Sequence, residues 1–134
     1  MIPSGNAILT TDLNVVTQPS KQHRMDLDKN RIILTCDSLE AVKQTVFKIL
    51  NTERYSYLIY SWDYGIELMD LYGQSPMYAC PEIERRVKEA LLQDDRITAV
   101  DNFEFNTSVK GVVSVTFTVH TFFGDLNEEM AVNI

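Results

Sequence analysis

Apolar and polar residues alternate regularly between residues 112 and 123. The apolar positions are Val113, Val115, Phe117, Val119 and Phe123. Because successive side chains of a strand point to opposite faces, this pattern predicts a strand with one buried face. Residues 97–105 predict a second strand, and residues 106–111 supply a turn, so the two strands are expected to form an antiparallel hairpin.

Two segments show the three- and four-residue spacing of an amphipathic helix. The first segment is residues 41–50. Its apolar positions are Val42, Val46, Ile49 and Leu50, and Leu39, just before the segment, continues the same spacing. Asp37 precedes this helix at a capping position, and Glu40 follows three residues later, which predicts a capping box. The second helix is predicted to begin at Pro81, since proline is favoured in the first position of a helix. Its apolar positions are Ile83, Val87, Ala90 and Leu91.

The remaining segments predict shorter elements. Residues 21–36 alternate around a turn formed by Asp28-Lys29-Asn30, which predicts a hairpin. Residues 66–71 predict a short helix that ends at Gly73. The acidic tail that begins at residue 125 is expected either to fray or to add a last strand.

Together these elements predict an α+β fold, in which a small antiparallel or mixed β-sheet packs against two main helices. Residues 1–20 contain two prolines, a glycine and two asparagines, so we expect an extended N-terminal arm with at most one short strand. Residues 21–134 are expected to form a single domain, because a chain of 134 residues can bury a core of its own without disulfides or metal.

The composition argues against two classes of partner. No apolar run approaches the roughly 20 residues that cross a bilayer, and the N-terminus lacks the pattern of a secretory signal, so we expect no membrane partner. The chain has 19 acidic and 12 basic residues and a net charge of −7, and its basic residues are scattered. Such a surface repels phosphate backbones, so nucleic acid is not an expected partner.

The cysteines and histidines do not suggest a metal site. Cys36 and Cys80 form no C-x-x-C pair, which favours reduced thiols in a cytoplasmic setting. His23 and His120 have no neighbouring acid or cysteine that would make a metal or nucleophilic site, so each is expected to be an ordinary polar residue. We therefore expect neither a metal nor a cofactor.

Asp63, Glu67 and Asp70 form the best carboxylate group in the sequence. Glu67 lies within helical reach of both neighbours, and two such acids could divide the acid and base roles of a glycosidase. The alternative is a solvated acidic helix edge beside packed aromatic residues. We favour the alternative, because no carboxylate pair stands out by its spacing.

Two longer blocks of sequence point to a family. In the first, the helix 41–50 leads into Asn51-Thr52-Glu53-Arg54-Tyr55 and then into Ile59-Tyr60-Ser61-Trp62-Asp63-Tyr64-Gly65. In the second, Glu89-Ala90-Leu91-Leu92-Gln93-Asp94-Asp95-Arg96-Ile97 closes a helix and opens a strand. Over residues 31–119 the chain resembles the gp25-like, XkdS-type baseplate proteins of contractile phage tails, often called sheath initiators.

This resemblance implies a gp25-like fold and a structural role in the baseplate of a phage, a prophage or a phage-tail-like bacteriocin. The protein would link the baseplate wedge to the sheath and template sheath assembly by β-strand exchange, without a cofactor. Its implied partners are wedge proteins and the first ring of sheath subunits, close to the tail tube and in six copies per particle. Assembly would take place in the host bacterial cytoplasm. The alternative function is a tail-associated, lysozyme-like enzyme that cleaves peptidoglycan.

The resemblance also implies two sets of residues for protein interaction. The first is the turn Asp94-Asp95-Arg96, where relatives commonly carry Glu-Pro-Arg against the wedge; Arg96 matches, and Asp95 replaces the proline. An arginine fork at this turn can grip carboxylates or exposed carbonyls. The second is the edge of the C-terminal hairpin, with Val115, Phe117 and Val119, where unpaired N–H and C=O groups can accept a strand.

Overall fold

The computed structural model describes residue 16 and residues 19–134, which fold around two helices and two antiparallel sheets. The arm expected over residues 1–20 therefore lies almost entirely outside the described residues. The elements in chain order are β1 (Gln22–Asp26), β2 (Arg31–Cys36), α1 (Ser38–Leu50), the 3-10 helix η1 (Met69–Leu71), α2 (Pro76–Leu91), β3 (Ile97–Asn106), β4 (Val112–Thr121) and β5 (Gly124–Asn133). This arrangement confirms the predicted α+β class.

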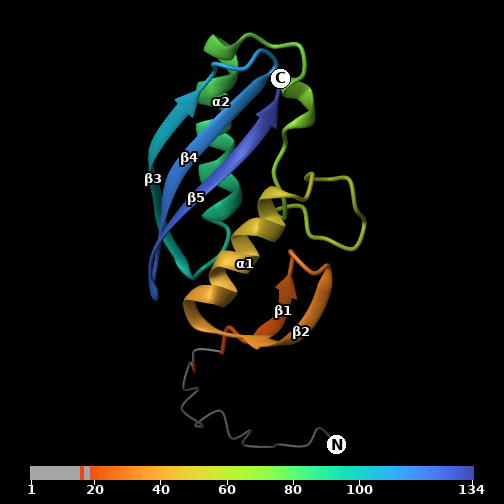
Figure 1. Cartoon of the computed structure of the whole chain (residues 1–134), viewed down its shortest axis with the longest axis vertical. Helices are drawn as coiled ribbons and strands as arrows, with labels where there is room; N and C mark the ends of the chain where they lie inside the picture. Colours follow the sequence, from red (N-terminus) through yellow and green to blue (C-terminus); the bar gives the residue numbers. More distant parts are fainter. Residues whose placement is uncertain (1–15, 17–18) are drawn as a thin grey trace, which may run out of the picture.

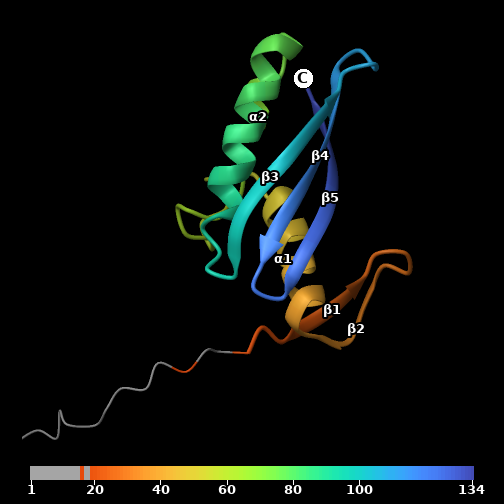
Figure 2. The same cartoon turned by 90° about the vertical axis from the view of Figure 1, so that its left-hand side faces the viewer.

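The larger sheet has the order β3-β4-β5, with both neighbours antiparallel. The alternation predicted for the central strand is confirmed as far as Val119, since Val113, Val115, Phe117 and Val119 are buried and the residues between them are not. The strand ends at Thr121, before Phe123, so this ring is exposed and not on the buried face as predicted. Helix α2 lies behind the sheet and α1 lies beside β5 (Figures 1 and 2). The acidic tail does not fray; it forms β5, a full partner of β4.

The core joins the inner face of the large sheet to one face of each helix. Its largest fully buried side chains are Phe117, Ile66, Leu71, Ile83, Leu91, Val42, Val46, Val87, Val113, Val115 and Val119. Burying such side chains is the main favourable contribution to folding. Neither helix in the described part of the chain is long and apolar enough to cross a membrane.

The predicted N-terminal hairpin is confirmed, and it forms a separate two-stranded sheet. The side chain of Gln44 is one of several that attach this hairpin to α1. The amide of Gln44 accepts a hydrogen bond from the Met25 backbone N–H at 2.8 Å and donates one to the His23 carbonyl at 2.7 Å. The Gln44 amide thus satisfies two backbone groups of β1, which has no further strand beside it among the described residues.

The start of α2 differs from the prediction. The helix begins at Pro76, after Ser75 as its N-cap, and Pro81 lies inside it. Pro76 already occupies the favoured first position, and Ala79, buried one turn before Ile83, extends the apolar face backwards. Pro81 costs the helix one backbone hydrogen bond but does not end it.

Two shorter predictions also need correction. Asp37 does cap α1, but its carboxylate accepts from the Ser38 N–H at 2.7 Å, and Glu40 pairs with Arg24 instead of closing a capping box. The helix predicted over residues 66–71 is shorter, because only η1 is helical and Ile66 forms a parallel bridge to Glu53.

Candidate functional site

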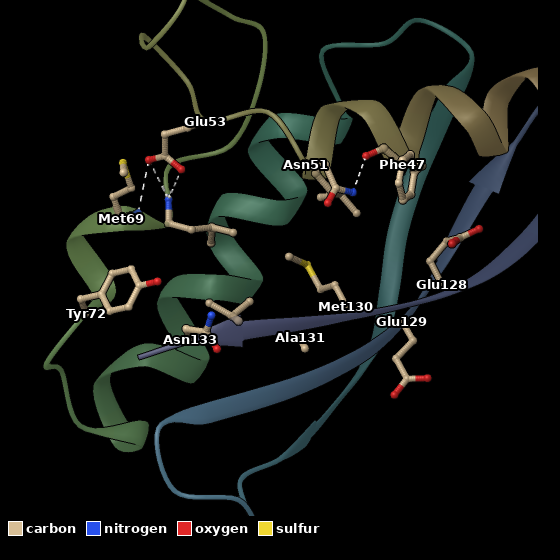
Figure 3. A pocket seen from close by; sticks show the side chains of 13 residues that line it. Phe47, Asn51, Glu53, Met69, Tyr72, Glu128, Glu129, Met130, Ala131 and Asn133 are labelled. Carbon is tan, nitrogen blue, oxygen red and sulfur yellow. Dashed lines mark hydrogen bonds between the residues drawn. The ribbon is translucent and has the colours of Figure 1, made fainter. Parts of the chain in front are cut away.

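A groove of about 500 Å³ runs along the outer edge of β5. Residues 128–133 of β5 form one side of it, and the end of α1 and the segment around η1 form the other (Figure 3). Phe47 and Asn51 come from α1, whereas Met69 and Tyr72 come from the η1 segment. The site therefore combines a strand edge with a wall of mixed apolar and polar side chains.

The wall contributed by α1 ends abruptly at Asn51. The Asn51 side-chain amide donates to the carbonyl of Phe47 at 2.8 Å, and its backbone N–H donates to the same oxygen at 3.1 Å. Satisfying the last carbonyls of a helix in this way fixes where it stops. The Phe47 ring is left 40% exposed, so an apolar surface faces the groove.

The carboxylate of Glu53 fixes the second wall. It accepts hydrogen bonds from the backbone N–H groups of Leu68 at 3.1 Å and Met69 at 3.3 Å (Figure 3). Residues 52–54 and Ile66 are also joined by backbone hydrogen bonds of 3.0 and 3.1 Å. The loop between Arg54 and Gly65 is thus closed at its base, and the segment that follows it is held against the end of α1.

Arg86 of α2 anchors the same segment from the other side. This buried guanidinium makes a two-point contact with the Asp70 carboxylate, donates to the Glu67 carbonyl at 2.9 Å and donates to Glu82 at 3.2 Å. Hydrogen bonding by Arg86 holds the pKa of Asp70 below its ordinary value. The groove wall is therefore attached to both main helices.

The two edges of the large sheet differ in regularity. Within the described residues, β3 and β5 each pair only with β4. The β3 ladder has two register shifts, and Asn102 at the second has a positive φ of 52°. β5 pairs with β4 over ten consecutive residues without a shift. Because bulges disfavour the addition of another strand, β5 offers the better acceptor edge.

The structure places Val115, Phe117 and Val119 away from either open edge. They lie on β4, which pairs on both sides, and their side chains are buried in the core. The sequence located the hairpin correctly but not its open edge. The missing information was β5, whose acidic residues resemble a solvated tail when they are read without their pairing partner.

The turn Asp94-Asp95-Arg96 uses its arginine internally. Arg96 Nε and Nη2 donate to the two oxygens of Asp94 at 2.9 and 2.6 Å, and Nη2 also contacts Thr45 of α1 at 3.2 Å. These hydrogen bonds raise the pKa of Arg96. Asp95 is exposed. Nε and Nη2 of the fork therefore fix the turn and hold it against α1.

An exposed aromatic loop borders this turn. Leu58, Ile59 and Trp62 are at least 81% exposed, and Trp62 packs edge-on against Tyr55 with ring centroids 6.0 Å apart. A hollow lined by Ser61 and residues 63–65 of the loop and by Asp94 of the turn lies between the two features. The fold thus brings the two sequence blocks of the family resemblance side by side.

The three candidate catalytic carboxylates are separated by arginines. Asp63 and Glu67 lie 3.8 and 3.7 Å from Arg54, whereas Asp70 pairs with Arg86. A general acid needs a raised pKa, and that of Asp70 is lowered. The described residues contain no group of three histidine, cysteine or acidic side chains arranged to hold a metal ion.

His120 has two acidic neighbours that the sequence did not reveal. Its ring nitrogens contact Asp125 at 2.7 Å and Asp101 at 2.9 Å, so one imidazole links three strands on the outer face of the sheet. Asp125 and then Asp101 raise the pKa of His120. The prediction of an isolated histidine was therefore wrong, because both partners come from cross-strand pairing.

A raised pKa makes His120 a source of pH-dependent stability. Protonation is favoured in the folded state, so the stabilisation is full below the ordinary imidazole pKa of about 6.5 and is lost as the pH rises through the raised value. The urea midpoint of the native chain should exceed that of His120→Gln at pH 6, and the difference should vanish at pH 9. The same comparison in an Asp101→Asn, Asp125→Asn background should show no pH dependence. A pH-independent difference in the native background would contradict this assignment.

Comparison with known proteins agrees with this description. Residues 10–124 match the family model described as contractile injection system sheath initiator. The phage-like element PBSX protein XkdS of Bacillus subtilis strain 168 is 38% identical over 120 residues, which cover 85% of this chain and 83% of that protein.

A solved structure shows the same fold. It is a Geobacter sulfurreducens protein named as a candidate tail lysozyme, with a TM-score of 0.59 and 19% sequence identity over 71% of this chain and 89% of that one. At this identity the likeness concerns the fold alone. The family model and the Bacillus relative together confirm the predicted resemblance, and the chain belongs to the family of contractile injection system sheath initiators.

Proposed function

We propose that this component of a contractile phage tail baseplate starts the sheath by accepting an extended strand from a first-ring sheath subunit along β5. Membership of the sheath initiator family supports the baseplate role. The observation that supports strand acceptance is the regular, unshifted β5 ladder, whose outer edge borders a groove. Open strand edges present rows of backbone donors and acceptors that pair readily with another chain.

The added strand would gain affinity from backbone hydrogen bonds and specificity from its alternate side chains. Each such hydrogen bond contributes about 0.5–1.5 kcal/mol net, so a single strand binds weakly. We propose six copies around the tail tube, which would convert six weak contacts into one stable ring. Each copy would then act as a folded template for the strand, assembled in the host bacterial cytoplasm.

We place the baseplate wedge at the other conspicuous surface of the chain. Asp94 of the turn and residues 63–65 of the loop line the same hollow, and Leu58, Ile59 and Trp62 of this loop are exposed. Large exposed apolar side chains of this kind mark protein interaction surfaces. Asp95 offers the free charge at this surface, whereas Asp94 and Arg96 hold the turn in shape.

A structural role without hydrolysis fits this chain better than an enzymatic one. A retaining or inverting glycosidase needs two opposed carboxyl groups, one of them with a raised pKa. Here the three candidate carboxylates face two different arginines. The tail lysozyme name of the solved relative belongs to a protein that shares the fold at 19% identity.

Photo-crosslinking in assembled tails tests which edge accepts the strand. A benzoylphenylalanine placed at exposed Ala131 on β5 should crosslink to a sheath subunit, because Ala131 lines the groove. The matched control places the same group at exposed Glu104 on β3. Crosslinks to sheath from position 104 alone, or from neither position, would overturn the proposal.

A further inference from the structure

The inner face of β5 carries one charged residue among apolar ones. Leu126, Glu128, Met130 and Val132 alternate toward the helices, and Glu128 lies opposite buried Phe117 of β4. Figure 3 shows Glu128 on the side of α1 and Glu129 pointing away. An acidic side chain at such a position faces the core side of the sheet instead of open solvent.

One oxygen of the Glu128 carboxylate lacks a hydrogen-bond partner among the described residues. Its Oε1 atom is buried and unsatisfied within the described residues. Burial raises the pKa of Glu128, and the positive charge of Lys43 opposes this rise. The described residues show no ion pair between Glu128 and Lys43. Buried polar atoms in folded proteins are nearly always paired, so an orphaned carboxylate oxygen points to a missing partner.

Glu128 also lies where an added strand would pass. Together with Phe47 it lines both the β5 groove and a second hollow. The lining of this second hollow includes Met25 and Leu27 of the N-terminal hairpin, and also the cations Arg24 and Lys43. A chain extended along β5 would cross the junction of these two hollows. Glu128 therefore lies beside the edge along which the strand would run.

We infer that the incoming strand carries a lysine or arginine that pairs with Glu128, and that this pair selects the partner. The inference rests on the proposed function and adds the chemistry of the strand. Glu53, Glu128 and Glu129 line the β5 groove, and none of the described residues that line it is a lysine or an arginine. A cation would meet complementary charge there, and a buried hydrogen-bonded charge pair confers specificity as well as affinity.

The chain's own N-terminal arm does not fit this description. Residues 1–20 contain no lysine, arginine or histidine, so they offer no side-chain cation for Glu128. A segment from another tail protein is the occupant that matches the charge.

Replacing Glu128 with glutamine, which has nearly the same shape but no charge, tests the charge pair without removing the edge that accepts the strand. Binding of the purified sheath subunit from the same tail should weaken at least tenfold in Glu128→Gln, and its salt dependence should decrease. The matched control Glu129→Gln, next along β5 but on the opposite face, should change binding less than twofold. The melting temperature of isolated Glu128→Gln should rise, because the variant no longer buries an unpaired charge.

A charge swap completes the test. Mass spectrometry of the product crosslinked at Ala131 should identify a sheath segment that contains a lysine or arginine. Changing that residue to glutamate should abolish binding, and Glu128→Lys should restore it. If the crosslink forms but Glu128→Gln binds normally, this inference fails and strand acceptance stands. A lowered melting temperature of Glu128→Gln would show that Lys43 already satisfies the carboxylate, and would also overturn it.

Discussion

Replacing Gly65 with alanine is expected to destabilise the folded chain by about 3 kcal/mol. Gly65 has a φ of +98°, which side chains rarely adopt, and an added Cβ would lie 2.6 Å from the Thr52 carbonyl oxygen. That oxygen cannot retreat freely, because it accepts the Ile66 backbone N–H at 3.0 Å. Urea unfolding followed by far-UV circular dichroism measures the loss.

Gly73 provides the matched control for Gly65. It also has a positive φ, +79°, but an added Cβ would meet no atom within 4 Å. Gly73→Ala should therefore cost only the backbone strain, about 1 kcal/mol. Equal losses in the two variants would show that the close approach to Thr52 is not what constrains Gly65.

The close approach of Gly65 to Thr52 also affects the shape of the groove. The close contact joins residues 52–54 to Ile66, and this junction positions Glu53 to bind the Leu68 and Met69 N–H groups. Displacing the junction would move one groove wall relative to β5. Binding to the sheath should therefore decrease in Gly65→Ala even at temperatures where the variant remains folded.

Periodicity predicted the elements that bury one regular face. The alternation around Val115 predicted β4, and the spacing of Val42 and Val46 predicted α1. When one face of an element is buried, apolar residues recur along the sequence with the period of that strand or helix. The start of α2 was misplaced, since Pro76 and Pro81 carry the same local preference. Only the tertiary burial of Ala79 distinguishes them.

The candidate site could be predicted less fully, because it depends on pairing between distant segments. Asp125 and Glu128 belong to one acidic run in the sequence, but β5 sends them to different surroundings. Asp125 pairs with His120 on the outer face, whereas Glu128 is half-buried beside α1. The register between β4 and β5 places these two residues on opposite faces of the sheet, and the local sequence does not reveal that register.

Arg96 shows the opposite case, in which a motif was recognised but its pairing within the fold was not predicted. The sequence identified the turn and its arginine through the family resemblance. The structure shows that Asp94, 11% exposed at its side chain, already occupies the guanidinium fork. Recognition of a motif locates a residue, but the unused donors that are left for a partner depend on its neighbours in the fold.

Arg86→Met should lower the free energy of unfolding by about 2 kcal/mol. The methionine keeps most of the buried volume but removes the two-point contact with Asp70 and leaves the Glu67 carbonyl without its donor. The estimate is below that for a fully buried ion pair, because the Asp70 side chain is 63% exposed. Urea unfolding at neutral pH measures the loss.

The pH dependence identifies Asp70 as the partner of Arg86. Asp70 has a lowered pKa in the fold, so its pairing stabilises above the ordinary aspartate pKa of about 3.9 and is lost as the pH falls through the lowered value. The difference in the free energy of unfolding between the native chain and Arg86→Met should therefore become smaller below about pH 4. Arg85→Met is the matched control, since this neighbour contacts only exposed or half-buried acids on the helix surface and should change stability little. Faster hydrogen exchange at residues 68–72 in Arg86→Met, but not in Arg85→Met, would show that Arg86 holds the groove wall, whereas equal exchange would assign that task to Glu53 alone.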